Sequence, residues 1–324
     1  MSLLEVEGLT LDVPVESGHG RILHGVDLTV EAGSAIGIVG ESGSGKSMTV
    51  RAVAALLPPG ATTSGTVSFA GEQVAGMSSD RLRRYRSSQV AMIFQDPRAA
   101  INPVRKVGNF LIENAVTNLG WSRSRAREKA IEVLREVGIT DPERRLNAYP
   151  SELSGGLLQR VMIASTLLYE PELLLADEPT TALDVTTQSA VMALIDRLRR
   201  ERGMAMVFVT HDLELAAAVC DTSLVMYAGR IVERVPAAEL HERSRHPYTR
   251  ALLDARPRLE GRETRLRAIP GQPLSGLEDV TGCAFAARCP FALEICRTDD
   301  PPVVVVDDGE VRCHRVHDRL WEVP

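Results

Sequence analysis

The chain has 324 residues, 44% of them hydrophobic and 25% charged, a composition typical of a soluble globular protein larger than one average domain. Its formal net charge of −6 argues against a broad nucleic-acid-binding surface, so no nucleic-acid partner is expected. No apolar run approaches the ~18 residues that span a bilayer. Apolar and polar residues alternate at the start of the sequence, which carries Glu5 and Glu7, whereas a signal peptide needs a basic start and an apolar block. We therefore expect a cytosolic chain with reduced thiols.

The first part of the chain alternates strand-like and helix-like patterns, which predicts an α/β fold. Period-two alternation predicts strands at residues 3–13, 25–33 and 66–71, and nearly continuous apolar runs predict doubly buried strands at residues 34–40, 171–177 and 205–212. Each of the apolar runs ends in a polar motif. We therefore expect these motifs at strand C-termini, where ligands gather in open α/β sheets.

Two later segments depart from this alternation. Residues 97–150 include a stretch, residues 122–139, with apolar spacing near the helical period and basic residues on the opposite face, which predicts a helical insertion. After Glu233 the pattern loosens and prolines and glycines mark boundaries. We therefore divide the chain into a domain of residues 1–235 and a C-terminal extension of residues 236–324.

A glycine-rich stretch, GESGSGKS at residues 40–47, fits the phosphate-binding pattern G-x-x-x-x-G-K-S between a predicted strand and a predicted helix. Backbone N–H groups in such a loop, and the helix N-terminus after it, attract phosphate oxygens. We predict that Lys46 bridges the β- and γ-phosphates of a nucleotide and that Ser47 ligates Mg²⁺. The predicted nucleotide-binding residues are Gly40, Ser42, Gly43, Ser44, Gly45, Lys46, Ser47 and Met48.

A pair of carboxylates, Asp177 and Glu178 in ELLLADEP, ends a predicted buried strand. There Asp177 can hold hydrated Mg²⁺, and Glu178 can orient or deprotonate an attacking water. Adjacent carboxylates at a strand end also serve as a helix cap or a solvated turn. The phosphate loop in the same chain favours the catalytic reading, with Glu178 as the base.

Further motifs resemble those of one family. LSGGLLQR, residues 153–160, resembles the signature sequence of ABC-type ATPases, and the family's other motifs follow in the right order. Gln95 matches the Q-loop, Asp184 ends a TALD sequence that matches the D-loop, and His211 matches the switch histidine. The resemblance implies a P-loop NTPase core with a small antiparallel β subdomain and a helical subdomain.

The resemblance also implies how the site works. Ser154, Gly155 and Gly156 open a helix, and in the family they face the γ-phosphate of ATP held by a second subunit. Gln95, with Ser47 and Asp177, would organise Mg²⁺, and His211 would contact the γ-phosphate. ATP would thus join two ATPase domains, and because this chain has one phosphate loop, the resemblance implies a homologous but different ATPase chain as its partner in a heterodimer.

Two positions depart from the family pattern. Leu157 and Leu158 stand where relatives commonly have Gln or Met-Arg, although the phosphate-facing Ser-Gly-Gly is intact. No aromatic residue stands upstream of the phosphate loop to stack on adenine. Val13, Val15 or His19 would have to supply that contact, which puts base selectivity in doubt.

The end of the chain resembles one branch of the family, the oligopeptide and dipeptide importers. HPYTRALL, IPGQPLSG and GCAFAARC resemble their C-terminal extension, and FQDPRAAINPV resembles their segment after the Q-loop. The resemblance implies an ATP-hydrolysing subunit, peripheral on the cytoplasmic side of the inner membrane, with two permease subunits and an extracytoplasmic binding protein. An importer of nickel or another small solute, a soluble non-transport ABC ATPase and an ATP-controlled redox sensor remain open.

Four of the five cysteines lie near the end of the chain, at Cys283, Cys289, Cys296 and Cys313. In a reducing compartment such clustering favours metal binding, although the spacing is not the paired C-x₂-C of common zinc sites. Four thiolates also hold iron–sulfur clusters, and the importer resemblance favours [4Fe–4S], with structural zinc and free thiols as alternatives. We expect the fifth cysteine, Cys220, to be a buried core thiol.

Overall fold

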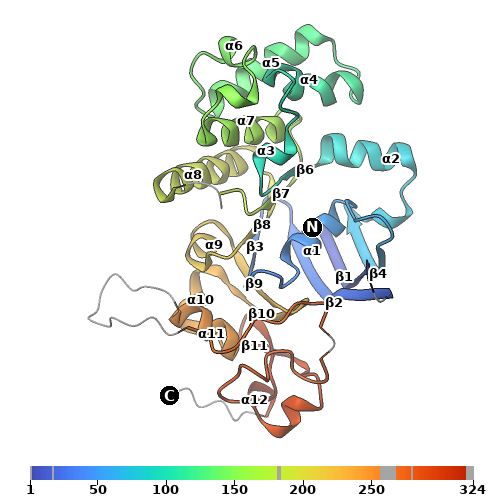
Figure 1. Cartoon of the computed structure of the whole chain (residues 1–324), viewed down its shortest axis with the longest axis vertical. Helices are drawn as coiled ribbons and strands as arrows, with labels where there is room; N and C mark the ends of the chain where they lie inside the picture. The colour runs from blue at the N-terminus through green and yellow to red at the C-terminus, as the bar shows by residue number, and fades with distance from the viewer. Residues whose placement is uncertain (1, 17, 181–183, 256–267, 279, 319–324) are drawn as a thin grey trace. The chain divides into compact units, whose positions relative to one another are not determined.

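We describe a computed structural model of the chain (Figure 1), in which residues 2–16, 18–180, 184–255, 268–278 and 280–318 are described. They divide into two compact units. The first unit contains Met1–Leu3, Val30–Ser34 and Glu72–Phe208, and the second contains Leu4–Thr29, Ala35–Gly71 and Val209–Pro324. None of the helices in the described residues is long and apolar enough to cross a membrane.

The first unit is mainly helical. Helices α4, α5 and α7 pack on one another, as the green part of Figure 1 shows. Ser122 caps α5 by accepting a hydrogen bond from the Arg125 N–H, and Gly203 ends α8 in the left-handed conformation that glycine adopts without strain. The helices of this unit are α2 (Ser79–Arg84), α3 (Pro97–Ala100), α4 (Val107–Thr117), α5 (Arg123–Glu136), α6 (Pro142–Arg145), α7 (Gly155–Leu167) and α8 (Val185–Arg202).

The sheet of the first unit is parallel. Strand β6 (Val90–Ile93) pairs with β7 (Leu173–Asp177), with Val90 opposite Leu173 and Ile93 opposite Ala176. Strand β8 (Ala205–Thr210) follows β7 in the strand order, and the chain passes into the second unit within β8. All residues of β7 and β8 are buried, as their continuous apolar sequences predicted.

The second unit contains a small antiparallel sheet. Strand β1 (Ser2–Val15) lies between β2 (Gly18–Glu31) and β4 (Thr62–Phe69), and β1 pairs antiparallel with β4. The alternation that predicted β1 and β2 appears as alternating buried and exposed side chains along much of these strands, whereas β4 is exposed over its first half and becomes buried only at Phe69. The two-residue β5 (Glu72–Gln73) belongs to the first unit.

The larger sheet of the second unit begins at β3 (Ala35–Val39), which pairs parallel with β9 (Thr222–Tyr227). Antiparallel pairing then runs from β9 to β10, to β12 and to β11. The last two strands form a hairpin in the C-terminal extension, where the sequence pattern predicted no strands. The remaining elements are α1 (Lys46–Val53), α9 (Leu213–Val219), β10 (Arg230–Pro236), α10 (Leu240–Arg243), α11 (Pro247–Asp254), β11 (Val303–Val306), β12 (Gly309–Arg312) and α12 (His314–His317).

Parallel strands, an antiparallel sheet and covering helices confirm the predicted α/β class. The predicted strands at residues 34–40, 171–177 and 205–212 correspond to β3, β7 and β8. The boundary predicted at residue 235 stays a prediction.

Candidate functional site

The glycine-rich loop joins the buried strand β3 to helix α1, as the motif predicted. Gly40 has φ +154 and Gly45, the N-cap of α1, has φ +104, a region that side chains disfavour. A Cβ atom on Gly40 would lie 2.2 Å from the Met226 carbonyl oxygen. Glycine is therefore required at Gly40 for two independent reasons, the backbone angle and the close neighbour.

Lys46 is the first residue of α1 and is 4% exposed. Its ammonium donates hydrogen bonds to the carbonyl oxygens of Gly40 and Glu41, each at 2.9 Å. The positive charge is thus held over the loop, beside the N–H groups at the helix N-terminus, and this combination attracts an anion such as a phosphate. Of the other predicted nucleotide-binding residues, Ser42 and Gly43 are exposed, Ser47 and Met48 are half-buried, and Ser44 and Gly45 are buried.

In the first unit, β7 delivers a carboxylate pair to its C-terminal end. Asp177 is the last residue of the strand and is 1% exposed. Glu178 follows with φ +44, a strained angle for a non-glycine residue and one often found at active sites. The Gln95 side chain, just after β6, donates a hydrogen bond of 3.0 Å to Glu178 Oε2. The structure therefore brings together two residues that the motifs placed 83 positions apart.

The signature segment opens α7. Ser154 is the exposed N-cap, and its hydroxyl accepts a hydrogen bond of 3.4 Å from the Leu157 N–H. Gly155 begins the helix and is exposed, so a hydroxyl and small residues stand at a helix N-terminus, as predicted. Leu158 is 1% exposed, so the leucine at this unusual position packs in the core.

Two more motif residues stand at element ends. Asp184 caps α8: its carboxylate accepts hydrogen bonds from the N–H and the hydroxyl of Thr187, at 3.0 and 2.8 Å, and these bonds lower the pKa of Asp184. The rest of the TALD motif, residues 181–183, lies outside the described residues. His211 directly follows β8 and is exposed.

The candidate site residues fall in both units. The phosphate loop and His211 belong to the second, and Gln95, Asp177, Glu178, Asp184 and the signature belong to the first. The Mg²⁺ set of Ser47, Gln95 and Asp177 therefore stays a prediction. The residue that replaces the adenine-stacking aromatic also stays a prediction. Of the three candidates, Val13 is buried, Val15 is half-buried and His19 is exposed.

The four clustered cysteines share one neighbourhood in the second unit. Burial raises the pKa of Cys283 to about 12, with smaller contributions from Cys296, Cys313 and Cys289, and burial raises that of Cys289 to about 11. Across the described ranges, however, no three His, Cys, Asp or Glu side chains are arranged as a metal-binding group. The thiols of Cys283 and Cys289 thus lie near the other cysteines, but the described residues form no ligand set in this structure.

Cys220 is half-buried, so the expectation of a fully buried thiol is corrected. Its Sγ lies 3.3 Å from where a Cβ on Gly37 would stand, against β3. Cys220 is the C-cap of α9, next to the exposed Asp221.

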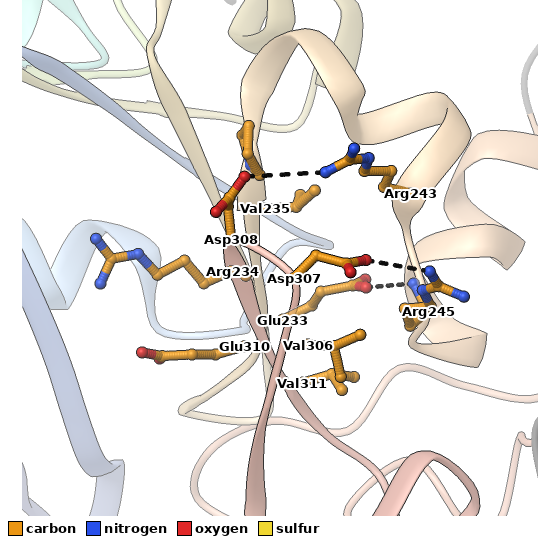
Figure 2. A pocket seen from close by; sticks show the side chains of 12 residues that line it. Glu233, Arg234, Val235, Arg243, Arg245, Val306, Asp307, Asp308, Glu310 and Val311 are labelled. Atoms are coloured by element: carbon orange, nitrogen blue, oxygen red, sulfur yellow. Dashed lines mark hydrogen bonds and ion pairs between the residues drawn. The ribbon is translucent and has the colours of Figure 1, made fainter. Parts of the chain in front are cut away.

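A small pocket between β10 and the extension surrounds a buried carboxylate, Glu233 of β10 (Figure 2). Glu233 is 3% exposed, and its Oε1 accepts hydrogen bonds from the N–H groups of Arg245 and His246, the latter at 3.1 Å. Burial raises the pKa of Glu233 to about 7, against the opposing effects of the Thr249 hydroxyl and these two N–H groups. Glu233 therefore fixes the start of α11, the helix of the HPYT motif.

The HPYT residues have distinct contacts. His246 is the N-cap of α11, and its Nδ1 accepts a hydrogen bond of 3.1 Å from the Tyr248 N–H. Burial lowers the pKa of His246 to about 3, so the ring is neutral near pH 7. Pro247 occupies the first helical turn, where it costs no hydrogen bond. Tyr248 reaches the phosphate loop, where its hydroxyl accepts a hydrogen bond of 2.8 Å from the Glu41 N–H.

Arg288 also reaches the phosphate loop from the extension. Its guanidinium donates hydrogen bonds of 2.6 and 3.1 Å to the two carboxylate oxygens of Glu41. Sequence reasoning missed Glu41 and Arg288 as site residues, and it singled out Tyr248 only as part of a motif. No spacing rule links residues 247 positions apart, so the sequence held no signal for this pair.

The phosphate loop before α1, the strand-end carboxylates with Gln95 and the serine-capped helix α7 are the features of an ATP-binding cassette ATPase. Residues 23–181 match the family described as ABC transporter, and residues 232–296 match the one described as oligopeptide/dipeptide transporter, C-terminal region.

Curated relatives extend the likeness over almost the whole chain. The chain is 47% identical to a probable peptide ABC transporter ATP-binding protein (y4tR) of Sinorhizobium fredii, over 95% of this chain and 92% of that protein. It is 41% identical to the oligopeptide transport ATP-binding protein OppD of Salmonella typhimurium, over 96% and 92%, and 40% identical to the dipeptide transport ATP-binding protein DppD of Escherichia coli, over 97% of each. The chain therefore belongs to the ATP-binding proteins of the oligopeptide/dipeptide ABC transporter family.

A solved structure supports the fold. The dimeric structure of MJ0796, a bacterial ABC transporter cassette, matches with a TM-score of 0.65 and 27% identity, covering 72% of this chain and 98% of that one. This likeness and the family matches confirm the predicted ABC ATPase fold.

Proposed function

We propose that this chain hydrolyses ATP to energise the import of dipeptides or oligopeptides across the cytoplasmic membrane. The observation that carries the proposal is the joint presence of the phosphate loop held around Lys46 and an HPYT extension within a chain that matches peptide transport ATP-binding proteins over almost its whole length. Import of nickel or another small solute is the second candidate, and a soluble ABC ATPase without a transport role is the third.

In this proposal the site residues have separate roles. Gly40 to Met48 bind the phosphates, and Ser47, Gln95 and Asp177 hold Mg²⁺, which neutralises charge on the phosphates. Glu178 is the general base for the attacking water, and His211 contacts the γ-phosphate. Ser154, Gly155 and Gly156 complete the site of a homologous ATPase partner, with Asp184 beside them. The 3.0 Å hydrogen bond from Gln95 to Glu178 supports the pairing of Mg²⁺ sensing with water activation.

The partners follow from the same assignment. No helix among the described residues spans a membrane, so we propose two separate permease subunits, an extracytoplasmic binding protein that delivers the peptide and a peripheral position on the cytoplasmic side. We further propose that residues 97–150 dock on the permeases. An open pocket beside α5, lined by Trp121, Arg125 and Tyr169 among others, supports this choice of surface.

Transport by the assembled complex tests the function. Co-expressed with two permeases, a second ATPase and a binding protein, the chain should purify with the permeases and support ATP-dependent uptake of a labelled dipeptide into proteoliposomes. Uptake of nickel without peptide would favour the second candidate. A chain that hydrolyses ATP but never associates with permeases would contradict the importer.

We also propose that Cys283, Cys289, Cys296 and Cys313 hold a [4Fe–4S] cluster, with Zn²⁺ as the alternative. The other three cysteines all contribute to the raised pKa of Cys283, which supports the choice of ligands, and metal binding would require the thiols to lose their protons and draw together. Anaerobically purified protein should contain iron and labile sulfide, about four of each per chain. Stoichiometric zinc without iron, or protein free of metal, would contradict the cluster.

A further inference from the structure

Glu41, the second residue of the phosphate loop, is bound through each of its polar groups. Its N–H donates to the Tyr248 hydroxyl at 2.8 Å, and its carbonyl oxygen accepts from the Lys46 ammonium at 2.9 Å. Its carboxylate accepts two hydrogen bonds from the Arg288 guanidinium. One residue therefore connects the phosphate-binding lysine to two side chains of the C-terminal extension.

Arg288 is held in one place. Its side chain is 4% exposed, and Nε donates a hydrogen bond of 2.9 Å to the Pro270 carbonyl oxygen. The guanidinium lies 5.8 Å from the ring centre of Tyr227 and donates to the hydroxyl of that ring at 3.4 Å. A guanidinium so far removed from water needs its carboxylate partner, and its planar fork fixes that carboxylate in two directions.

Tyr248 is equally constrained. Its ring is fully buried, with its centre 4.6 Å from that of Tyr227 and 5.3 Å from that of Phe285. The His246 ring accepts a hydrogen bond from the Tyr248 N–H through Nδ1, and the same ring is hydrogen-bonded to the backbone of Arg312. The hydroxyl that meets Glu41 is thus the tip of a rigid group.

The same segment carries the cysteines. Phe285 and Arg288 lie between Cys283 and Cys289, and Arg312 directly precedes Cys313. Cys283 and Cys289 pack against the core cluster that contains Tyr227, Tyr248 and Phe285. The position of the two side chains that hold Glu41 therefore depends on the fold of the cysteine segment.

We propose that Arg288 and Tyr248 are positioning residues for nucleotide binding: they hold Glu41, and through its carbonyl Lys46, so that the fold of the cysteine segment sets the affinity of the phosphate loop for Mg–ATP. The inference rests on the ATP-binding part of the proposed function and is independent of the transported solute.

Equilibrium binding of Mg–ATP to the full chain provides the first test. Arg288→Met should weaken binding by about fivefold or more, the usual size of coupling between two sites, while kcat at saturating ATP changes less. Arg245→Met is the matched control, because Arg245 also forms an ion pair in the extension, with Asp307, away from the phosphate loop. Wild-type affinity in Arg288→Met, or an equal loss in both variants, would overturn the proposal.

Milder variants separate positioning from loss of fold. Arg288→Lys should recover part of the affinity, and Tyr248→Phe should speed hydrogen exchange of the Glu41 amide by removing its acceptor. Glu41→Gln should weaken binding in the wild-type background and add little to Arg288→Met. The proposal would be contradicted if the losses of affinity in Glu41→Gln and Arg288→Met were additive. It would also be contradicted if the Glu41 amide exchanged at the wild-type rate in Tyr248→Phe.

A cysteine variant tests the connection to the cysteine segment. Cys283→Ala should weaken Mg–ATP binding in the wild-type chain but have little further effect in Arg288→Met, since the connection is already broken. Equal effects in both backgrounds would contradict it. If every variant binds Mg–ATP with wild-type affinity, the positioning role of Arg288 and Tyr248 is wrong and the ATPase assignment stands. If the wild-type chain never binds Mg–ATP, the ATPase assignment itself fails.

Discussion

Replacing Glu178 with Gln should slow ATP hydrolysis by about 10²–10⁴-fold, the usual contribution of a positioned general base, while Mg–ATP still binds. The amide keeps the shape of the side chain and accepts the Gln95 hydrogen bond through its oxygen, but it does not take a proton from water. ATP should therefore remain in the site and, in the proposed function, hold this domain to that of its ATPase partner. Single-turnover kinetics and the amount of nucleotide retained on a sizing column measure both effects.

The same strand offers a matched control. Glu172 directly precedes β7, and its carboxylate accepts a hydrogen bond of 3.2 Å from the Gln89 side chain, as Glu178 does from Gln95 at the other end. Glu172→Gln should leave the rate of hydrolysis near that of the wild-type chain. Full turnover in Glu178→Gln, or an equal loss in both variants, would remove Glu178 from the role of base.

Glu233→Gln should make the chain more stable than wild type at pH 8 and should lose that advantage near pH 4.5. Burial raises the pKa of Glu233 in the folded chain to about 7, whereas the ordinary value for a glutamate is 4.5. Between these values the unfolded chain has lost the proton and the folded chain keeps it, so wild-type stability falls as the pH rises through this window. The glutamine oxygen still accepts the Arg245 and His246 N–H groups without carrying a charge.

The size of this effect follows from the shift. The interval between the ordinary pKa of 4.5 and the folded value of about 7 corresponds to about 3 kcal/mol of unfolding free energy. Denaturant unfolding at several pH values measures it, and Glu310→Gln, an exposed position on the paired strand β12, controls for the loss of a negative charge. Parallel pH profiles for wild type and Glu233→Gln would show that burial does not raise this pKa.

Much of the fold could be predicted because its signals are local. The phosphate loop carries its own glycines, and β3, β7 and β8 carry continuous apolar sequences, so each predicts its own conformation. Ser154 and Asp184 are helix N-caps, a position at which serine and aspartate are preferred because their side-chain oxygens accept a backbone N–H of the first turn. Gln95 was identified only by its match to the Q-loop of the family, and the pairing of β6 with β7 brings its side chain to Glu178.

The missed features depend on contacts distant in sequence. The hairpin of β11 and β12 was not predicted, because a run of four valines beside aspartates and prolines gives no alternation to read. The Arg288–Glu41 pair depends on where the extension folds back, which no local propensity determines. A carboxylate like Glu233 looks like any other glutamate in the sequence, and only its burial gives it an unusual pKa.

The hairpin of β11 and β12 also affects how readily the edge of the sheet can pair with strands of other chains. It occupies the open side of β10, whose backbone groups would otherwise be available to strands of other chains. A shortened chain lacking these strands would leave β10 as an unpaired edge, whereas in the full chain the edge among the described strands is β11, whose four residues are too few to pair extensively with other chains.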